Sequence, residues 1–252
     1  MSPGADSSGA PWEGRHFEEN AFQSDDGTVT PELAEALAGF KAGRLLASDV
    51  VDALRGARLL IPLIAHLGES GENAAGQLVD KTQELSIVTV EGPDGRSVLP
   101  VFSSVTTMQA WNPAARPVPA DGERVAVAAA GEGTDLVVLD PTSPTEFVVR
   151  RPALWAMAQR QDWMPSPLDP DVFTAFAESV GPELGVVDIS LAAGDPDARL
   201  AGPELIVRLA LARGLTKEEL DAILARLAKR WAASDVIATR VDSLKVQLVA
   251  HD

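Results

Sequence analysis

Residues 85–103 constrain the fold most, because they have the pattern of two β-strands joined by a tight turn. The flanking segments, 85–91 and 96–103, are rich in β-branched and apolar side chains, which favour strands. The four residues 92–95 read Gly-Pro-Asp-Gly and supply the backbone conformations that reverse a chain. The sequence therefore predicts an antiparallel hairpin centred on Pro93-Asp94, with alternate residues of each arm facing the core.

The composition is that of a globular protein. The chain has 252 residues, of which 46% are apolar, and a mean hydropathy of +0.05. A chain of this length can bury a full core, and we expect two domains. The longest apolar runs, such as residues 59–65, are far shorter than the roughly 20 residues that span a bilayer. The N-terminus lacks the basic and apolar segments of a secretory signal. These features predict a cytoplasmic protein without a membrane segment.

Cysteine and histidine content excludes several kinds of chemistry. The chain has no cysteine, so disulfides, thiolate catalysis, iron–sulfur clusters and thiolate zinc sites are excluded. The three histidines, His16, His66 and His251, lie far apart in the sequence, and none has a ligand-type partner at helical spacing. We therefore expect neither a metal site nor a cofactor.

The charge is strongly acidic, with a net charge of −16 and a pI near 4.5. Such a surface repels phosphate backbones, whose binding depends on neutralisation by lysine and arginine. Direct binding to nucleic acid is therefore disfavoured. A local basic patch, or a protein partner that itself belongs to a nucleic-acid machine, remains compatible with this charge.

Residues 1–29 form a polar, acidic segment that contains three isolated aromatic side chains, Trp12, Phe17 and Phe22. We expect a flexible tail. Its aromatic residues have two interpretations: they hold the tail against its own domain, or they form a short motif that docks on a partner.

Residues 30–160 are expected to form an α/β domain, a mixed sheet with flanking helices. A continuous apolar run at 58–65 is typical of a buried strand, and Pro62 within it favours an edge strand or a bulge. Residues 66–80 are expected to form a polar, acidic surface loop. Helices are predicted near 30–41, 48–56 (capped by Ser48), 104–111, 121–130 and 152–159, and further strands near 136–140 and 146–150, with an extended proline-rich segment at 114–119.

A proline-rich linker at 161–170 marks the expected boundary with a second domain at 171–252. Few contacts are expected to cross it. The second domain has the order helix, strand, strand, helix, strand, which predicts a smaller α+β layer of helices over an antiparallel sheet. Its elements are expected at 172–180, 184–191, 204–212, 216–231 and 244–249.

Several spaced motifs agree in order with one known family. They are Leu99-Pro-Val-Phe-Ser103, Trp111, Arg116-Pro-Val-Pro119, Asp140-Pro141 and Arg150-Arg-Pro-Ala-Leu-Trp155. With these motifs the chain resembles the N-terminal domain of the SseB family from about Val50 to Gln159. The resemblance implies an α/β domain, often followed by a smaller C-terminal domain, in small intracellular bacterial proteins without an established reaction. The segment after Pro170 resembles the second domain of that family in element order only.

No set of residues in the sequence has the pattern of a catalytic site. A nucleophile with a base, a metal cluster and a phosphate loop are all missing, and Gly131-Glu-Gly133 precedes a strand instead of following one. We therefore expect a non-enzymatic module that binds or regulates another cytoplasmic protein, with an oligomeric state that the sequence leaves open. The alternative is a sensor that binds a small anionic ligand.

The candidate binding residues combine aromatic and arginine side chains, the types that dominate interface energies. We expect them to share one surface region, with the arginines available to hold an anion or an acidic peptide. The competing interpretation places the aromatic rings in the core. The candidate residues are Phe102, Ser103, Trp111, Arg116, Arg150 and Arg151.

Overall fold

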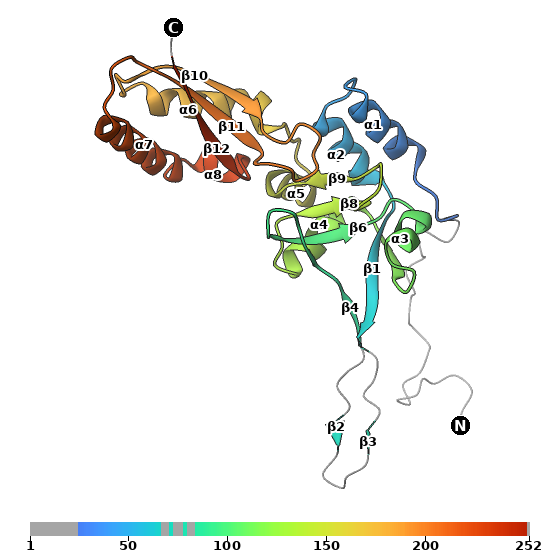
Figure 1. Ribbon diagram of the computed structural model, residues 1–252. Coiled ribbons are helices and arrows are strands. Elements are labelled where there is room, and N and C mark those ends of the chain that lie inside the picture. The colour runs from blue at the N-terminus through green and yellow to red at the C-terminus, as the bar shows by residue number, and fades with distance from the viewer. Residues whose placement is uncertain (1–24, 67–70, 73–77, 80–83, 251–252) are drawn as a thin grey trace, which may run out of the picture.

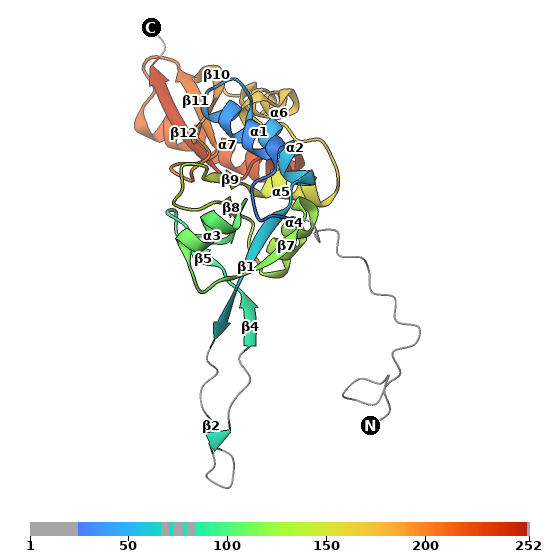
Figure 2. The same cartoon turned by 90° about the vertical axis from the view of Figure 1, so that its right-hand side faces the viewer.

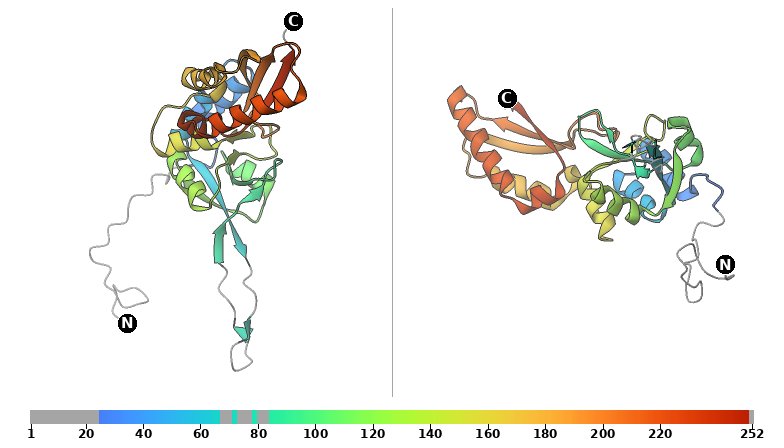
Figure 3. Two further views of the ribbon diagram at one scale, coloured as in Figure 1. Left: turned by 90° about the vertical axis from the view of Figure 1, so that its left-hand side faces the viewer. Right: turned by 90° about the horizontal axis from the view of Figure 1, so that it is seen from below.

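The computed structural model describes residues 25–66, 71–72, 78–79 and 84–250 (Figure 1). The fold is α/β, and Figures 1 and 3 show its two halves as separate lobes. Each lobe has its own large cluster of buried apolar side chains. Within the described part of the chain, no helix has the length and apolar composition needed to cross a membrane. The expected tail at 1–29 lies almost entirely outside the described residues, as does most of the loop expected at 66–80.

The first lobe contains five helices and nine short strands among the described residues. Its helices agree closely with the sequence prediction, although α2 is capped at Leu46, whose N–H donates to Asp49, and not at Ser48. The elements are α1 (Pro31–Lys41), α2 (Ala47–Gly56), β1 (Leu59–His66), β2 (Gly71–Glu72), β3 (Leu78–Val79), β4 (Glu84–Ile87), β5 (Val90–Glu91), β6 (Ser97–Val101), α3 (Val105–Trp111), β7 (Arg116–Ala120), α4 (Gly122–Gly131), β8 (Val137–Leu139), β9 (Phe147–Val149) and α5 (Arg151–Ala158).

Two groups of strands join into one curved layer in this lobe. One group has the order β5-β6-β8-β9, in which β6 and β8 are parallel, and the other has the order β4-β1-β7. They meet where Leu60 of β1 pairs with Phe102, with N···O distances of 2.8 and 2.9 Å. The strands therefore run in space from β7 through β1, β6 and β8 to β9.

The predicted hairpin is correct only at its tip. Val90 pairs with Val98, and Gly92 N–H donates to the Arg96 carbonyl at 2.8 Å across the turn. The beginning of the predicted first arm forms β4, which pairs with β1 and not with the second arm. β1 and β4 extend together away from the lobe (Figure 2). The expected alternation along the second arm is also wrong, because β6 is covered on both faces and four of its five residues are buried.

Pro62 does not mark an edge or a bulge. It lies in β1, which has β7 along one side. On the other side, Leu60 pairs with Phe102 and Leu63 pairs with Ile87 of β4. Pro62 lies between these two pairings, at the point where the neighbour of β1 changes from Phe102 to β4. The N–H that proline lacks is therefore not needed for a hydrogen bond between strands.

The second lobe places two helices over one face of a three-stranded sheet. Figure 3 shows α6 and α7 beside the strands of this lobe. The two helices contribute Phe176 and Trp231, whose rings lie 5.3 Å apart, to one core. The prediction of an antiparallel sheet is wrong for the last strand, because the chain crosses over through α7 and α8 and β12 returns parallel to β11. The elements are η1 (Ser166–Leu168), α6 (Pro170–Val180), β10 (Val186–Ala193), β11 (Leu205–Leu211), α7 (Lys217–Ala232), α8 (Asp235–Arg240), which the sequence analysis missed, and β12 (Leu244–Ala250).

More contacts cross the boundary between the lobes than the linker composition suggested. The loop between β10 and β11 reaches the first lobe, where Val148 N–H donates to the Ala198 carbonyl at 2.7 Å. Leu200 of the same loop is buried in a cluster with Val98 and Val138. The expectation that few contacts cross is therefore wrong, whereas the division into two domains that fold separately stays a prediction.

An acid-sensitive ion cluster holds α7 in the second lobe. Glu183 is buried and accepts hydrogen bonds from Arg226 at 2.6 and 3.0 Å and from Arg230 at 2.7 Å. The hydrogen bonds from Arg226, followed by those from Arg230, outweigh burial and lower the pKa of Glu183 from 4.5 to about 2. The ionised carboxylate is therefore favoured by folding.

This cluster should lose its stabilising effect in acid. Because the folded pKa is depressed, the contribution is present above pH 4.5 and is lost as the pH falls from about 4.5 to about 2. We expect a loss of order 1–2 kcal/mol, since solvent screens the half-exposed Arg226. Urea unfolding across this range should show a smaller fall for Glu183→Gln than for the original chain. Equal falls in the two proteins would contradict the assignment.

Candidate functional site

An arginine at the junction between the lobes is enclosed by carboxylates. Arg150 follows β9, is 7% exposed, and donates to Asp195 at 2.6 Å and to Asp242 at 3.0 Å. Its remaining terminal N–H groups donate to the Gly202 carbonyl at 2.9 Å and to Ser243 Oγ at 3.3 Å. Both terminal nitrogens of this guanidinium are therefore occupied by the protein itself.

A second arginine shares one of these carboxylates. Arg96, in the hairpin turn, binds Asp242 with two hydrogen bonds of 3.0 Å each and Asp94 with one of 2.7 Å. Burial alone would raise the pKa of Asp242, but the hydrogen bonds and charges of Arg96 and Arg150 hold it below its ordinary value. The network joins side chains of the first lobe to the second lobe through ionised groups.

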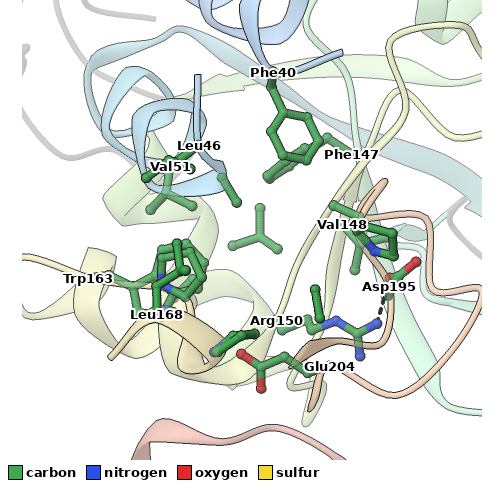
Figure 4. Close-up of a pocket in the computed structure, with 18 of the residues that line it drawn as sticks. Phe40, Leu46, Val51, Phe147, Val148, Arg150, Trp163, Leu168, Asp195 and Glu204 are labelled. Atoms are coloured by element: carbon green, nitrogen blue, oxygen red, sulfur yellow. Dashed lines mark hydrogen bonds and ion pairs between the residues drawn. The ribbon is translucent and has the colours of Figure 1, made fainter. Parts of the chain in front are cut away.

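Beside this network lies a pocket of about 330 Å³, which we call the junction pocket (Figure 4). In Figure 4, Phe40 stands at one end of the pocket and Glu204 at the other, with Trp163 and Leu168 along one side. The walls come from the α1–α2 region, β9, the linker and β10. The apolar lining includes Phe40, Leu46, Val51, Phe147, Trp163 and Leu168, and the polar residues are Arg150, Asp195 and Glu204.

A wider hollow of about 810 Å³, which we call the junction cleft, shares Trp163 with the junction pocket. It is bordered by α5, the linker, the start of α6 and the end of α8. Trp155 is 41% exposed and Met164 is 49% exposed in its lining. The guanidinium of Arg151 lies 4.9 Å from the centre of the Trp155 ring, within the range of a cation–π contact.

Three of the predicted site residues lie together, but mostly in the core. Phe102 is fully buried with Leu60 and Met108, and its ring centre lies 5.2 Å from that of the half-buried Trp111. Ser103 is also buried, and its Oγ donates to Asp140 at 2.6 Å. The core interpretation therefore holds for Phe102, and Ser103, predicted as a binding residue, is buried beside it.

Asp140 is the centre of this buried polar group. Its carboxylate accepts from Ser103 N–H at 2.8 Å, from Thr107 Oγ1 at 2.8 Å and from Thr145 Oγ1 at 2.8 Å, in addition to the Ser103 hydroxyl. The residue has a φ of 46° and is fully buried. Four hydrogen bonds leave the carboxylate little capacity for a ligand, so we assign the group a structural role at the ends of β6 and β8.

The three predicted arginines do not share one surface region. Arg116 is exposed in β7, whereas Arg150 follows β9, and these strands form opposite edges of the layer. Arg151 is half-buried, donates to the Val241 carbonyl at 2.7 Å and lies over the ring of Trp155, a residue that lines the junction cleft. The expectation of a single arginine cluster is therefore wrong, because the strand order separates residues that the sequence could not place.

Residues 33–156 match the family model described as the SseB protein N-terminal domain. The chain belongs to the SseB family through this domain. No curated protein and no solved structure matches the chain. The SseB domain thus supplies one wall of each junction hollow, including Arg150 and Trp155, whereas the linker and the second lobe lie outside the matched segment.

Several residues at the junction of the lobes were not predicted from the sequence. Trp163 and Met164 stand in the proline-rich linker, where two adjacent large apolar side chains in a polar segment were themselves a usable signal. The sequence around Glu204 and Asp242 has no comparable feature. Glu204 lines the pocket and Asp242 binds Arg150 only because of the way the second lobe packs against the first. Among the residues that the structure describes, no three acidic or histidine side chains converge as a metal site.

Proposed function

We propose that this SseB-family chain is a non-enzymatic cytoplasmic module that binds another protein through the junction cleft. The observation that carries the proposal is the exposure of Trp155 and Met164 in one hollow, beside Arg151. Tryptophan, methionine and arginine are enriched at protein interfaces, and tryptophan and arginine are frequent hot spots. A rim that carries Gln159, Gln161 and Asp162 fits the polar border of such a surface.

Geometry gives less support to an anion sensor built on the predicted arginines. The terminal nitrogens of Arg150 are occupied by Asp195 and Asp242, and Arg116 lies at the other edge of the layer. An anion would have to displace buried ion pairs to reach Arg150, at a large cost in desolvation. The protein-binding function needs no such rearrangement.

Site-specific photo-crosslinking tests the location of the partner surface. A photoreactive residue at Gln159, which is exposed in the junction cleft, should crosslink a discrete protein in cells of the native host. The same group at Leu184, which is 97% exposed and lines neither junction hollow, should not give that product. The same product from both positions, or from Leu184 alone, would contradict the proposed surface.

Trp155→Ala should then weaken binding of the captured partner by about 2 kcal/mol, or roughly 30-fold. Trp155 is 41% exposed, so loss of its ring should leave the thermal unfolding of the free chain nearly unchanged. The matched control, Leu184→Ala, removes a more exposed apolar side chain and should leave the affinity unchanged. Titration calorimetry measures both affinities, and an unchanged affinity in Trp155→Ala would exclude the ring as a hot spot.

A further inference from the structure

The junction pocket has the dimensions and the position of a small-molecule site. Its volume of about 330 Å³ lies within the usual range for ligand pockets, and it forms where two lobes meet. Most of its lining is apolar and comes from both lobes, so a bound molecule would contact the two lobes at once. The junction cleft is separate from it, and Trp163 lines both.

The polar end of the pocket carries an acceptor that no basic side chain neutralises directly. Glu204 is 8% exposed, and its Oε2 accepts the Asp242 N–H at 2.6 Å. In the described part of the protein Glu204 forms no ion pair within 4 Å, because the nearby Arg150 pairs with Asp195 and Asp242 instead. Figure 4 shows the carboxylate end of Glu204 turned toward the side of the pocket formed by Leu168 and Trp163.

The charges around this end are unbalanced. Two arginines, Arg96 and Arg150, face four carboxylates, those of Asp94, Asp195, Asp242 and Glu204. The group therefore holds two more negative than positive charges when all are ionised. Burial, which disfavours the charged form, raises the pKa of Glu204 and is consistent with an acid that lacks its own counter-ion.

A polar atom of the pocket wall is also without a partner. The Nε1 of Trp163 is buried and makes no hydrogen bond to any residue that the structure describes. Buried donors in folded proteins are nearly always paired, so an unpaired one in the wall of a pocket is informative. The protein itself therefore leaves this donor of the pocket wall unused.

From the cavity, its apolar walls and its unbalanced charge, we propose that the junction pocket binds a small molecule with an apolar body and one ammonium group. The ammonium group donates to the carboxylate of Glu204, and the body packs between Phe40, Phe147 and Leu168. This site is distinct from the protein-binding function proposed above and does not depend on it. It also reverses the charge that the sequence analysis assigned to a possible ligand.

Three probes of similar shape test this proposal on the full chain: 2-phenylethylamine, 2-phenylethanol and 3-phenylpropanoate. We expect the amine to raise the melting temperature most, the alcohol less and the carboxylate not at all, because a bound ligand stabilises by an amount set by its concentration over its Kd. Ligand-observed NMR provides the dissociation constants. Failure of the amine to bind, or equal binding of the amine and the carboxylate, would overturn the proposal.

Two variants place the binding in the pocket. Glu204→Gln keeps an acceptor for the Asp242 N–H but removes the charge, so affinity for the amine should fall about 10–100-fold, to that of the alcohol. Ala193→Phe adds a ring at an exposed position of the lining and should abolish binding of both probes even if Glu204→Gln folds poorly. Undiminished amine binding in Ala193→Phe would show that the probe binds elsewhere and would overturn the assignment.

Discussion

Replacing Arg150 with methionine should lower the free energy of unfolding by about 3–5 kcal/mol, the usual cost of removing one partner from a buried ion pair. The side chains of Asp195 and Asp242 are 2% and 1% exposed and would lose their shared cation. Asp242 keeps Arg96, but Asp195 would retain only backbone N–H donors, among them Leu200 at 2.8 Å. Urea unfolding at neutral pH measures the loss.

The matched control is Arg160→Met. Arg160 forms a salt bridge of 2.7 Å with Glu123, close to the 2.6 Å between Arg150 and Asp195, but its side chain is 81% exposed. Exposed pairs contribute little to stability, so this variant should unfold like the original chain. Equal losses in the free energy of unfolding in Arg150→Met and Arg160→Met would contradict this expectation. They would mean that burial of the ion pair does not determine its contribution to stability.

The Arg150 substitution should also loosen the junction between the lobes. Arg150 belongs to the first lobe, whereas both of its carboxylate partners belong to the second. The loop from Asp195 to Ala201 depends on this contact, since Asp195 also accepts from three backbone N–H groups of the loop. Hydrogen exchange in this loop should therefore increase more than exchange in α7, which lies away from the network.

Local chemistry explains which parts of the fold could be predicted. The turn at 92–95 and the capping box of Thr216 and Glu219 act over three or four residues, so their sequence patterns were sufficient. The partner of β4 could not be predicted in the same way. Its residues suit a strand in either pairing, and only the position of β1 in the assembled layer decides between them.

The same distinction applies to the candidate site. The sequence identified Arg150, Arg151 and the nearby Trp155 as unusual. Arg150 and Trp155 do line the junction hollows, and Arg151 lies against the Trp155 ring. The sequence could not show that Arg150 is neutralised, because its carboxylate partners follow 45 and 92 residues later. It could not separate Arg116 from the others either, because that separation depends on strand order. Tertiary pairing therefore decided which predicted residues are accessible.

Replacing Phe102 with alanine should cost about 3–5 kcal/mol, because it empties a fully buried ring site. The ring packs with Leu60, Met108, Ala115 and Trp111, and the backbone of Phe102 also holds the two groups of strands together through Leu60. A cavity at this position removes packing from both groups at once. Denaturant unfolding should show a lower midpoint with little change in the slope.

Phe173→Ala is the matched control, since Phe173 is 47% exposed on α6 and its removal opens no buried cavity. Its effect should therefore be small beside that of Phe102→Ala. The backbone hydrogen bonds between Phe102 and Leu60 survive the substitution, so the loss reports the ring and not the bridge between the strands. An effect of Phe102→Ala as small as that of the control would mean that the site refills or is accessible to solvent. In that case the surface interpretation of Phe102 would have to replace the core one.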